Sequence, residues 1–464
     1  KIGIAGKYIP NYADIFPGLK IPKTHPQSGD FFIHETFGQP ACSLWYTFTD
    51  NNFWRRLMRI LHTSDWHLGK KLEDFERLEE QESFINEISE LCDKENIDIV
   101  LLAGDVYDTY TPPSYAQELF SRAIKLITKD GRRPFIIIAG NHDSPERLSS
   151  ISSLAVEFGA FIFGKLEDSF SQKKYSSFEV LFAKPNFLKI QIKKETINIA
   201  TLPYPGESRI NLGDTAQTYL NQEEYSHIIK NISDGLCRDF DNESINIFMS
   251  HLFVSGAFTS DSERDISLGG TYVLNPSDLP AHADYIALGH LHRAQKVFSV
   301  QNACYSGSPL QYSRSESNNA KSVNIIDIYP SGKAVIKPTL LKCIKPVEIN
   351  VCTGIEQAVD YYMKNSERKF WSYLDINLKE PLSSSDIQLI KSQKKDIVSI
   401  CPFFEDSAQS SLTQRDIHEY SPQELFIKFY EHTEGHVPSK ELTELFTKVF
   451  YEEGQEDETP KTDL

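Results

Sequence analysis

The chain has 464 residues, which is too long for one ordinary domain and predicts two or three. Its formal net charge of −17 argues against a protein that grips nucleic acid unaided by bulk electrostatic attraction. A function that handles phosphate would need bound cations, a local basic patch or a partner. The seven cysteines are scattered without a Cys-x-x-Cys pair, which indicates reduced thiols and no zinc-ribbon site. No signal peptide and no apolar run near the ~20 residues of a membrane span are visible, so we expect a cytoplasmic protein without a membrane anchor.

The first 57 residues differ in character from the rest of the chain. They are rich in aromatic side chains and show no clear period, whereas Met58 leads directly into an apolar run. We expect residues 1–57 to be an atypical N-terminal extension without chemistry of its own. A small docking element is the alternative interpretation.

Residues 59–139 alternate between predicted strands and predicted helices. Apolar runs at 59–63, 97–103 and 135–139 predict strands, and amphipathic stretches at about 76–94 and from Pro112-Pro113-Ser114 onward predict helices. This β-α-β-α-β order predicts neighbouring, largely parallel strands with right-handed crossovers. Ligands of such sheets gather at the carboxyl ends of the strands.

The remainder of the chain predicts more sheet and then a change of composition. Hairpins are expected between residues 160 and 203, and strands at 245–249, 283–288, 303–308 and 323–328. From about residue 341, strands near 347–352, 373–378 and 397–401 with helices between them predict a compact α+β unit. The segment Ser421-Pro422-Gln423-Glu424 is typical of a helix start, and two short helices are expected before an acidic, disordered tail. The predicted units are therefore 1–57, 58–340, 341–412, 413–453 and 454–464.

Polar side chains follow five of the predicted strands directly. They are Asp65, His67, Asp105, Asn141, His142, His251, His290 and His292. A single histidine of this kind usually caps or packs, and His62, inside a strand, is interpreted that way. The joint pattern favours a metal site instead, and its mixed donors suit Mn²⁺, Fe or Zn better than Mg²⁺ alone. Asp105 is placed to bridge two ions that act on a phosphate ester. His142, next to the predicted ligand Asn141, could donate a proton to the leaving oxygen.

Several of these motifs together resemble a known family. Asp65-x-His67, Gly104-Asp105-x-x-Asp108, Gly140-Asn141-His142-Asp143, His251 and Gly289-His290-x-His292 resemble the five-motif signature of calcineurin-like metallophosphoesterases. The stretches HTSDWHLG (62–69), AGNHDSPER (139–147), ALGHLHRAQ (287–295) and SGSPLQYS (306–313) are similar to the SbcD family, the nuclease subunits of bacterial SbcCD complexes, related to Mre-type repair nucleases. The resemblance runs from Met58 to about Glu453.

The resemblance implies an α/β fold: a two-sheet β-sandwich flanked by helices, followed by a small α+β capping domain and C-terminal helices. It implies two divalent metal ions, with Mn²⁺ expected. One ion would be held by Asp65, His67, Asp105 and His292, and the other by Asp105, Asn141, His251 and His290. His142 would be catalytic without binding a metal, with Asp143 orienting it, and Asp108 receives no role.

The resemblance also implies a function and partners. The expected activity is that of a DNA nuclease in repair and recombination, an ATP-dependent exonuclease on duplex ends and an endonuclease on single strands or hairpins. The expected partners are DNA, an SbcC-like SMC-type ATPase docked by the terminal helices, and a second nuclease subunit within a heterotetramer. Another calcineurin-like phosphoesterase, a phosphoprotein phosphatase or cyclic-nucleotide phosphodiesterase, is the alternative; the complete ligand set argues against a non-catalytic scaffold. Two roles stay open for four basic residues, namely contacts with DNA phosphates or ordinary surface and carboxylate contacts. These residues are Lys70, Lys71, Arg147 and Arg293.

Overall fold

The computed structural model describes residues 57–206, 209, 222–263, 273–330, 332–404, 422–434 and, between 436 and 446, all but 441 and 444. The predicted N-terminal extension up to residue 56, the predicted acidic tail and much of the second predicted terminal helix lie outside these residues. Within the described ranges, no helix is both long enough and apolar enough to cross a membrane.

The first sheet has the strand order β16-β15-β1-β2-β3-β4. Its strands are β1 (Met58–Thr63), β2 (Ile99–Ala103), β3 (Phe135–Ile138), β4 (Ala160–Phe163), β15 (Ser322–Ile328) and β16 (Val335–Leu340). Strands β1 to β4 are parallel neighbours, which confirms the β-α-β-α-β prediction, and β15 and β16 pair antiparallel at one edge. The crossover segments contain α1 (Leu78–Lys94), α2 (Ser114–Thr128), α3 (Pro145–Ser150), α4 (Ser152–Ala155) and η3 (Val156–Phe158).

The second sheet has the strand order β13-β14-β12-β9-β8-β7-β6-β5. Its strands are β5 (Lys173–Lys174), β6 (Phe178–Lys184), β7 (Phe187–Ile192), β8 (Glu195–Leu202), β9 (Ile245–His251), β12 (Tyr285–Gly289), β13 (Gln295–Val297) and β14 (Val300–Tyr305). The predicted hairpins are found in β5 to β8, whereas β4 pairs in parallel with β3 and belongs to the first sheet. The short elements around this sheet are α5 (Gln222–Leu236), η5 (Cys237–Asp239), β10 (Phe253–Val254), β11 (Val273–Leu274), η6 (Pro276–Asp278) and η7 (Arg314–Glu316).

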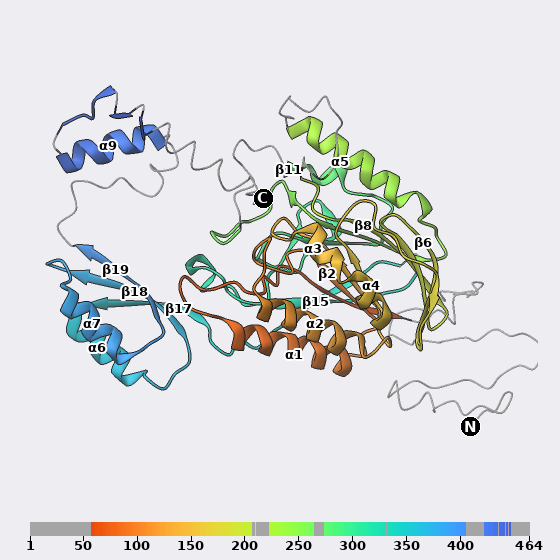
Figure 1. The fold of residues 1–464 in the computed structure, drawn as a ribbon, viewed down its shortest axis with the longest axis horizontal. Helices are drawn as coiled ribbons and strands as arrows, with labels where there is room; N and C mark the ends of the chain where they lie inside the picture. Colours follow the sequence, from red (N-terminus) through yellow and green to blue (C-terminus); the bar gives the residue numbers. More distant parts are fainter. Residues whose placement is uncertain are drawn as a thin grey trace, which may run out of the picture.

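The two sheets pack face to face and helices cover their outer faces, which gives the predicted sandwich (Figure 1). Side chains such as Ile60, Ile138 and Ile247 fill the space between the sheets. Phe84 and Phe120 belong to the core that joins α1 and α2 to the first sheet. Because the central strands are buried on both faces, they form continuous apolar runs in the sequence.

The unit after residue 341 is a small sheet of three parallel strands, drawn in blue at the left of Figure 1. It consists of β17 (Val347–Thr353), α6 (Ile355–Lys364), β18 (Trp371–Leu378), α7 (Ser384–Gln393) and β19 (Ile397–Phe404). The predicted mixture of strands and helices is present, and all its strands are parallel because a helix connects each pair. We call this unit the cap. The helix α9 (Pro422–Glu434) begins at the proline that the sequence placed in its first turn.

The cap is joined to the sandwich by a buried polar and apolar seam. The indole Nε1 of Trp371 donates to Glu80 Oε1 at 2.8 Å, and Arg77 Nε donates to the same oxygen at 2.6 Å. Leu72, Val347 and Trp371 are buried in one cluster across this seam. The cap is therefore fixed to α1, whose sequence continues from the first predicted metal loop.

Candidate metal centre

The predicted ligands lie where the carboxyl edges of the two sheets meet. Residues 65, 67, 105, 141 and 142 follow β1, β2 and β3 of the first sheet, and residues 251, 290 and 292 end or follow β9 and β12 of the second. The two edges are joined directly, since His251 Nδ1 lies 2.9 Å from the carbonyl oxygen of Ala103 at the end of β2. All eight side chains are buried. The topology thus brings together residues that are more than 200 positions apart.

The backbone at this edge is held in an unusual conformation. Asp65, His67, Asp105 and His290 have positive φ angles of 54°, 43°, 48° and 105°. Non-glycine residues seldom adopt such angles, and they persist where surrounding contacts impose them, often at functional sites. A Cβ atom on Gly140 would lie 2.1 Å from Asp105 Oδ1, so only glycine allows the turns after β2 and β3 to approach this closely.

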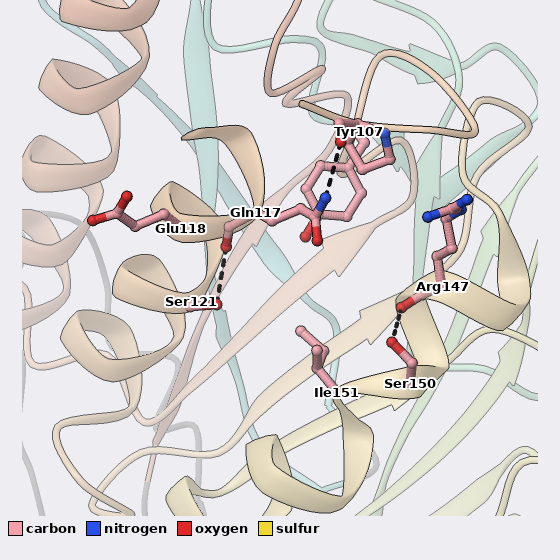
Figure 2. Close-up of a pocket in the computed structure, with 8 residues that line it drawn as sticks. Tyr107, Gln117, Glu118, Ser121, Arg147, Ser150 and Ile151 are labelled. Carbon is pink, nitrogen blue, oxygen red and sulfur yellow. Dashed lines mark hydrogen bonds between the residues drawn. The ribbon is translucent and has the colours of Figure 1, made fainter. Parts of the chain in front are cut away.

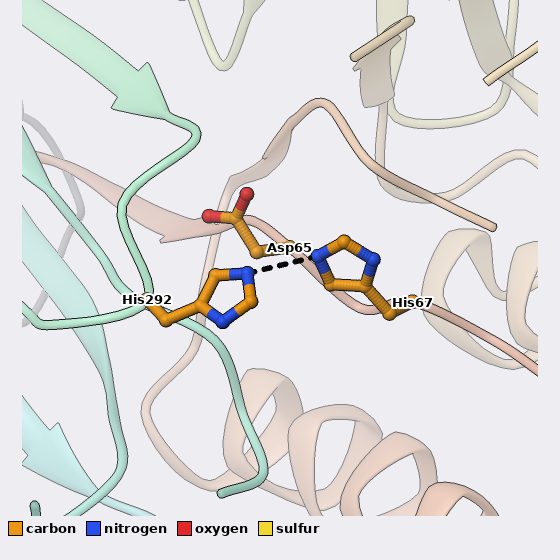
Figure 3. A group of neighbouring side chains, drawn as sticks. All are labelled: Asp65, His67 and His292. Carbon is orange, nitrogen blue, oxygen red and sulfur yellow. Dashed lines mark hydrogen bonds between the residues drawn. The ribbon is translucent and has the colours of Figure 1, made fainter. Parts of the chain in front are cut away.

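One group of donors is formed by Asp65, His67 and His292, shown in Figure 3. The Nε2 atoms of the two imidazoles are 2.9 Å apart and face each other. Asp105 Oδ2 lies 3.6 Å from His67 Nε2, which adds a second carboxylate to the same group. Two imidazole nitrogens and two carboxylates that converge in this way could hold a divalent metal ion.

A second group adjoins the first and uses Asp105 again. Asp105 Oδ2 lies 3.4 Å from His251 Nε2. Asn141 Oδ1 lies 2.9 Å from the same nitrogen and 3.2 Å from His290 Nδ1. The carboxylate of Asp105 thus stands between the two groups, at the position from which one side chain could serve two ions.

The other ring nitrogen of two histidines is held by a partner outside these groups. His251 Nδ1 lies 2.9 Å from the Ala103 carbonyl, whereas His67 Nδ1 lies 3.4 Å from Asp108 Oδ1 without a hydrogen bond. His292 Nδ1 is 2.6 Å from Ser262 Oγ. Metal-binding histidines usually have such a partner, which fixes the tautomer and orients the ring. The donor set and its surroundings therefore fit divalent metal ions.

The protonation preferences of these residues agree with that fit. Burial lowers the pKa of His67 to about 3 and the pKa of His290 well below its usual range, so both are neutral donors. Burial opposes protonation of His251, but the carboxylates of Asp105 and Asp65 outweigh burial and raise its pKa to about 9. Without metal, a positive charge on His251 would balance the buried carboxylates, and binding of cations would release that proton.

His142 and Asp143 lie beside this centre with different contacts. The His142 ring is perpendicular to that of His67 at a centroid distance of 4.7 Å, and its Nδ1 lies 2.7 Å from the backbone oxygen of Asp108. The Asp143 carboxylate instead accepts hydrogen bonds from the backbone amides of residues 106, 107 and 140, at 3.1, 2.9 and 2.8 Å. These contacts join the turns after β2 and β3, and the role of Asp143 in orienting His142, which the resemblance implied, stays a prediction.

Several residues around His292 were not predicted from the sequence. Glu316 is fully buried on η7, and its Oε1 lies 3.4 Å from His292 Nδ1. Lys321 Nζ donates to the His292 backbone oxygen at 3.0 Å and also pairs with Glu316. Asp108 was likewise left without a role, although it contacts both His67 and His142. Glu316 and Lys321 follow none of the ligand-bearing strands, and Asp108 belongs to the motif Gly104-Asp105-x-x-Asp108 but received no role from it.

The four basic residues that could contact phosphate lie in different parts of the structure. Lys70 Nζ pairs with Asp108 Oδ1 at 2.8 Å, and Lys71 Nζ pairs with Glu76 Oε1 at 2.7 Å. Arg147 lines a separate cavity of about 220 Å³ beside α2 and α3, shown in Figure 2. Arg293 follows the predicted ligand His292 in the sequence and lies over the ring of Phe258. Lys70 thus contacts Asp108 beside the metal centre, and Arg293 adjoins a predicted ligand in the sequence.

A two-sheet sandwich with imidazole, carboxylate and amide donors at one edge defines a metallophosphoesterase. The family model for calcineurin-like phosphoesterase matches residues 58–294. The SbcD subunit of the SbcCD nuclease from Bacillus subtilis (strain 168) is 36% identical over 398 residues, which cover 84% of this chain and 97% of that protein. The protein of the same name from Staphylococcus epidermidis is 32% identical over 276 residues, 58% of this chain and 66% of its own. The chain therefore belongs to the calcineurin-like phosphoesterases and, within them, to the SbcD family of SbcCD nuclease subunits.

Among solved structures, a dimetal phosphatase from Danio rerio is similar at 9% identity with a TM-score of 0.30, covering 60% of this chain and 98% of its own. A score of this size adds nothing to the family assignment.

Proposed function

We propose that this chain is a metal-dependent phosphodiesterase that cuts DNA as the nuclease subunit of an SbcCD-like complex in repair and recombination. The observation that carries the proposal is the pair of adjoining donor groups that share Asp105. Two cations about 4 Å apart can activate water and neutralise the oxygens of a phosphate diester. The relative from Bacillus subtilis, named a nuclease, aligns over almost its whole length.

In this proposal Asp65, His67, Asp105 and His292 hold one ion, and Asp105, Asn141, His251 and His290 hold the other. Mn²⁺ is the ion that we expect, because mixed imidazole and carboxylate donors suit it better than Mg²⁺ alone. When bound, the ions supply a nucleophilic hydroxide and Lewis-acid stabilisation of the phosphate. Ser262 and the Ala103 carbonyl keep the rings of His292 and His251 in position by the contacts described above.

His142 is the proposed proton donor. The Asp108 carbonyl can only accept a hydrogen bond, so Nδ1 of His142 carries a hydrogen and Nε2 is the atom that exchanges a proton with the leaving oxygen. Asp143 positions His142 indirectly, because its carboxylate joins the turn that carries His142 to the turn after β2.

The partners follow from the same assignment. DNA would lie across the metal centre beside the cap, and a second nuclease subunit and an SMC-type ATPase would complete a cytoplasmic heterotetramer. The proposed docking element for the ATPase is the terminal helical segment, in which the side chains of Phe429 and Leu445 are 66% and 57% exposed. Spaced apolar anchors of this kind suit a helix that lies on another helical surface.

Cleavage assays with Mn²⁺ test the proposal. Single-stranded DNA, hairpin DNA and a phosphopeptide are compared as substrates, with linear duplex DNA added in the presence of the ATPase and ATP. We expect both DNA substrates to be cut by the chain alone, and the duplex only with the ATPase. Faster hydrolysis of the phosphopeptide than of any DNA would contradict the nuclease and support a phosphoprotein phosphatase.

A further inference from the structure

A loop of residues 255–263 leaves β10 and passes over the metal ligand His292. Ser262 Oγ lies 2.6 Å from His292 Nδ1, and Glu263 Oε1 accepts a hydrogen bond from the His292 amide at 2.7 Å. The amide of Asp261 donates to Ser315 Oγ at 3.1 Å, next to the buried Glu316. The loop is therefore fixed relative to the metal centre by both the side chain and the backbone of a ligand.

Phe258 is presented outward from this loop on a rigid backbone. Its amide donates to Gln295 Oε1 at 2.8 Å, and its carbonyl accepts from Gln295 Nε2 at 2.8 Å. Both backbone groups of Phe258 are thus satisfied by one side-chain amide. The ring itself is 66% exposed, so it is held by this clamp and not by burial in a core.

A cation lies beside the same ring. The guanidinium carbon of Arg293 is 5.2 Å from the centroid of Phe258. Arg293 directly follows His292 in the sequence, so the guanidinium that lies over Phe258 belongs to the residue next to a proposed metal ligand. Aromatic rings and arginine planes are the surfaces on which unpaired nucleobases stack.

We propose that Phe258 and Arg293 form a stacking subsite for one unpaired base of the DNA strand that is cut. This inference rests on the proposed nuclease function and adds a determinant for single-stranded or frayed DNA. With a net charge of −17, the chain gains little from bulk attraction of phosphates, so base stacking supplies affinity that electrostatics does not. Stacking also tolerates any base, because every base has a π-face.

The occupant is a base and not an apolar protein segment because the neighbouring loop residues are polar. Ser260, Asp261 and Ser262 follow the ring closely, and the residue beside it in space is an arginine. A protein-docking surface needs a contiguous apolar patch, whereas a single clamped ring suits one planar ligand.

Binding of a fluorescently labelled single-stranded oligonucleotide to the full chain in EDTA tests the inference without cleavage. Fluorescence anisotropy should show Phe258→Ala to weaken binding roughly tenfold, as is usual for loss of one base–aromatic stack. Phe258→Trp should retain the affinity. Phe298→Ala is the matched control, since Phe298 is 97% exposed at the turn between β13 and β14 and should change nothing.

An oligonucleotide whose sugars lack bases sharpens the test. On this strand the wild-type chain and Phe258→Ala should bind equally, because the partner of the ring is missing. Equal affinity of the two proteins for the normal strand would overturn the inference, as would the same loss for a fully paired duplex or for Phe298→Ala. If Phe258→Ala weakened binding of the single strand but the wild-type chain cut no DNA with Mn²⁺, the proposed function would be overturned. The stacking subsite would then remain supported.

Discussion

The sandwich and the cap both contain parallel strands joined by helices, yet their carboxyl edges differ. In the sandwich, strands end at buried aspartate, asparagine and histidine residues, and Asp65, His67 and Asp105 adopt left-handed backbone angles. In the cap, β17, β18 and β19 end at Thr353, Leu378 and Phe404, and the only positive φ among its described residues belongs to a glycine. Parallel topology thus supplies an edge, and only polar donors held under backbone strain turn that edge into a site.

The largest effect is expected from removing the carboxylate shared by the two donor groups. Asp105→Ala should abolish cleavage and reduce bound metal at both positions, because Asp105 contacts His67 on one side and His251 on the other. Metal analysis after dialysis, together with a DNA-cleavage assay, measures both effects. Asp375→Ala is the matched control in the cap, since its carboxylate pairs with Arg314 at 2.6 Å and faces no donor group. Equal metal loss in Asp105→Ala and Asp375→Ala would contradict the prediction that metal binds at the edge of the sandwich and not in the cap.

The next largest effect separates metal binding from catalysis at the same edge. His142→Asn should keep the metal content of the wild type and lower the cleavage rate by on the order of 10²–10⁴-fold, the usual contribution of a positioned general acid. Wild-type activity in this variant would refute the proton-donor role. Loss of metal instead would identify His142 as a ligand, because a nitrogen of its ring lies within 4.8 Å of ligand atoms of His67 and Asp105.

The sequence predicted the fold and the ligand edge because both depend on local patterns. Apolar runs that end in Asp65, Asp105 and Asn141 are visible without any structure, and the resulting chain order implies parallel neighbours. The residues around the ligands could not be predicted in the same way. Glu316 on η7 contacts His292, and the backbone oxygen of Asp108 contacts His142. Both roles depend on tertiary contacts, which produce no periodic pattern in the sequence.

A smaller effect is expected from one of those unpredicted residues. Glu316→Gln should weaken Mn²⁺ binding on the order of 10–100-fold, as is usual when the partner of a metal-binding histidine is altered. The variant keeps the side-chain shape but loses the charge that faces His292 and Lys321. Titration calorimetry with Mn²⁺ measures the affinity.

Arg314→Ala is the control from the same turn. Its guanidinium pairs with Asp375 in the cap and is 34% exposed, so the ion pair contributes little and Mn²⁺ affinity should stay within about twofold. A larger loss in Arg314→Ala than in Glu316→Gln would mean that the cap, and not Glu316, positions His292.

The smallest effect is expected from replacing a glycine in the cap, which we compare with a glycine at the metal centre. Gly354 follows β17 in the cap with φ 77° and ψ 162°, a region that other residues rarely enter, and a Cβ there would meet nothing within 4 Å. Gly354→Ala should therefore cost ~1–3 kcal/mol of unfolding free energy from backbone strain alone. Metal content and cleavage should be unchanged, because no ligand lies nearby. Gly140→Ala makes the contrast, since its Cβ would collide with Asp105 and displace the shared carboxylate. Chemical denaturation and metal analysis of both variants check the comparison, and loss of metal from Gly354→Ala would show that strain in the cap reaches the metal centre.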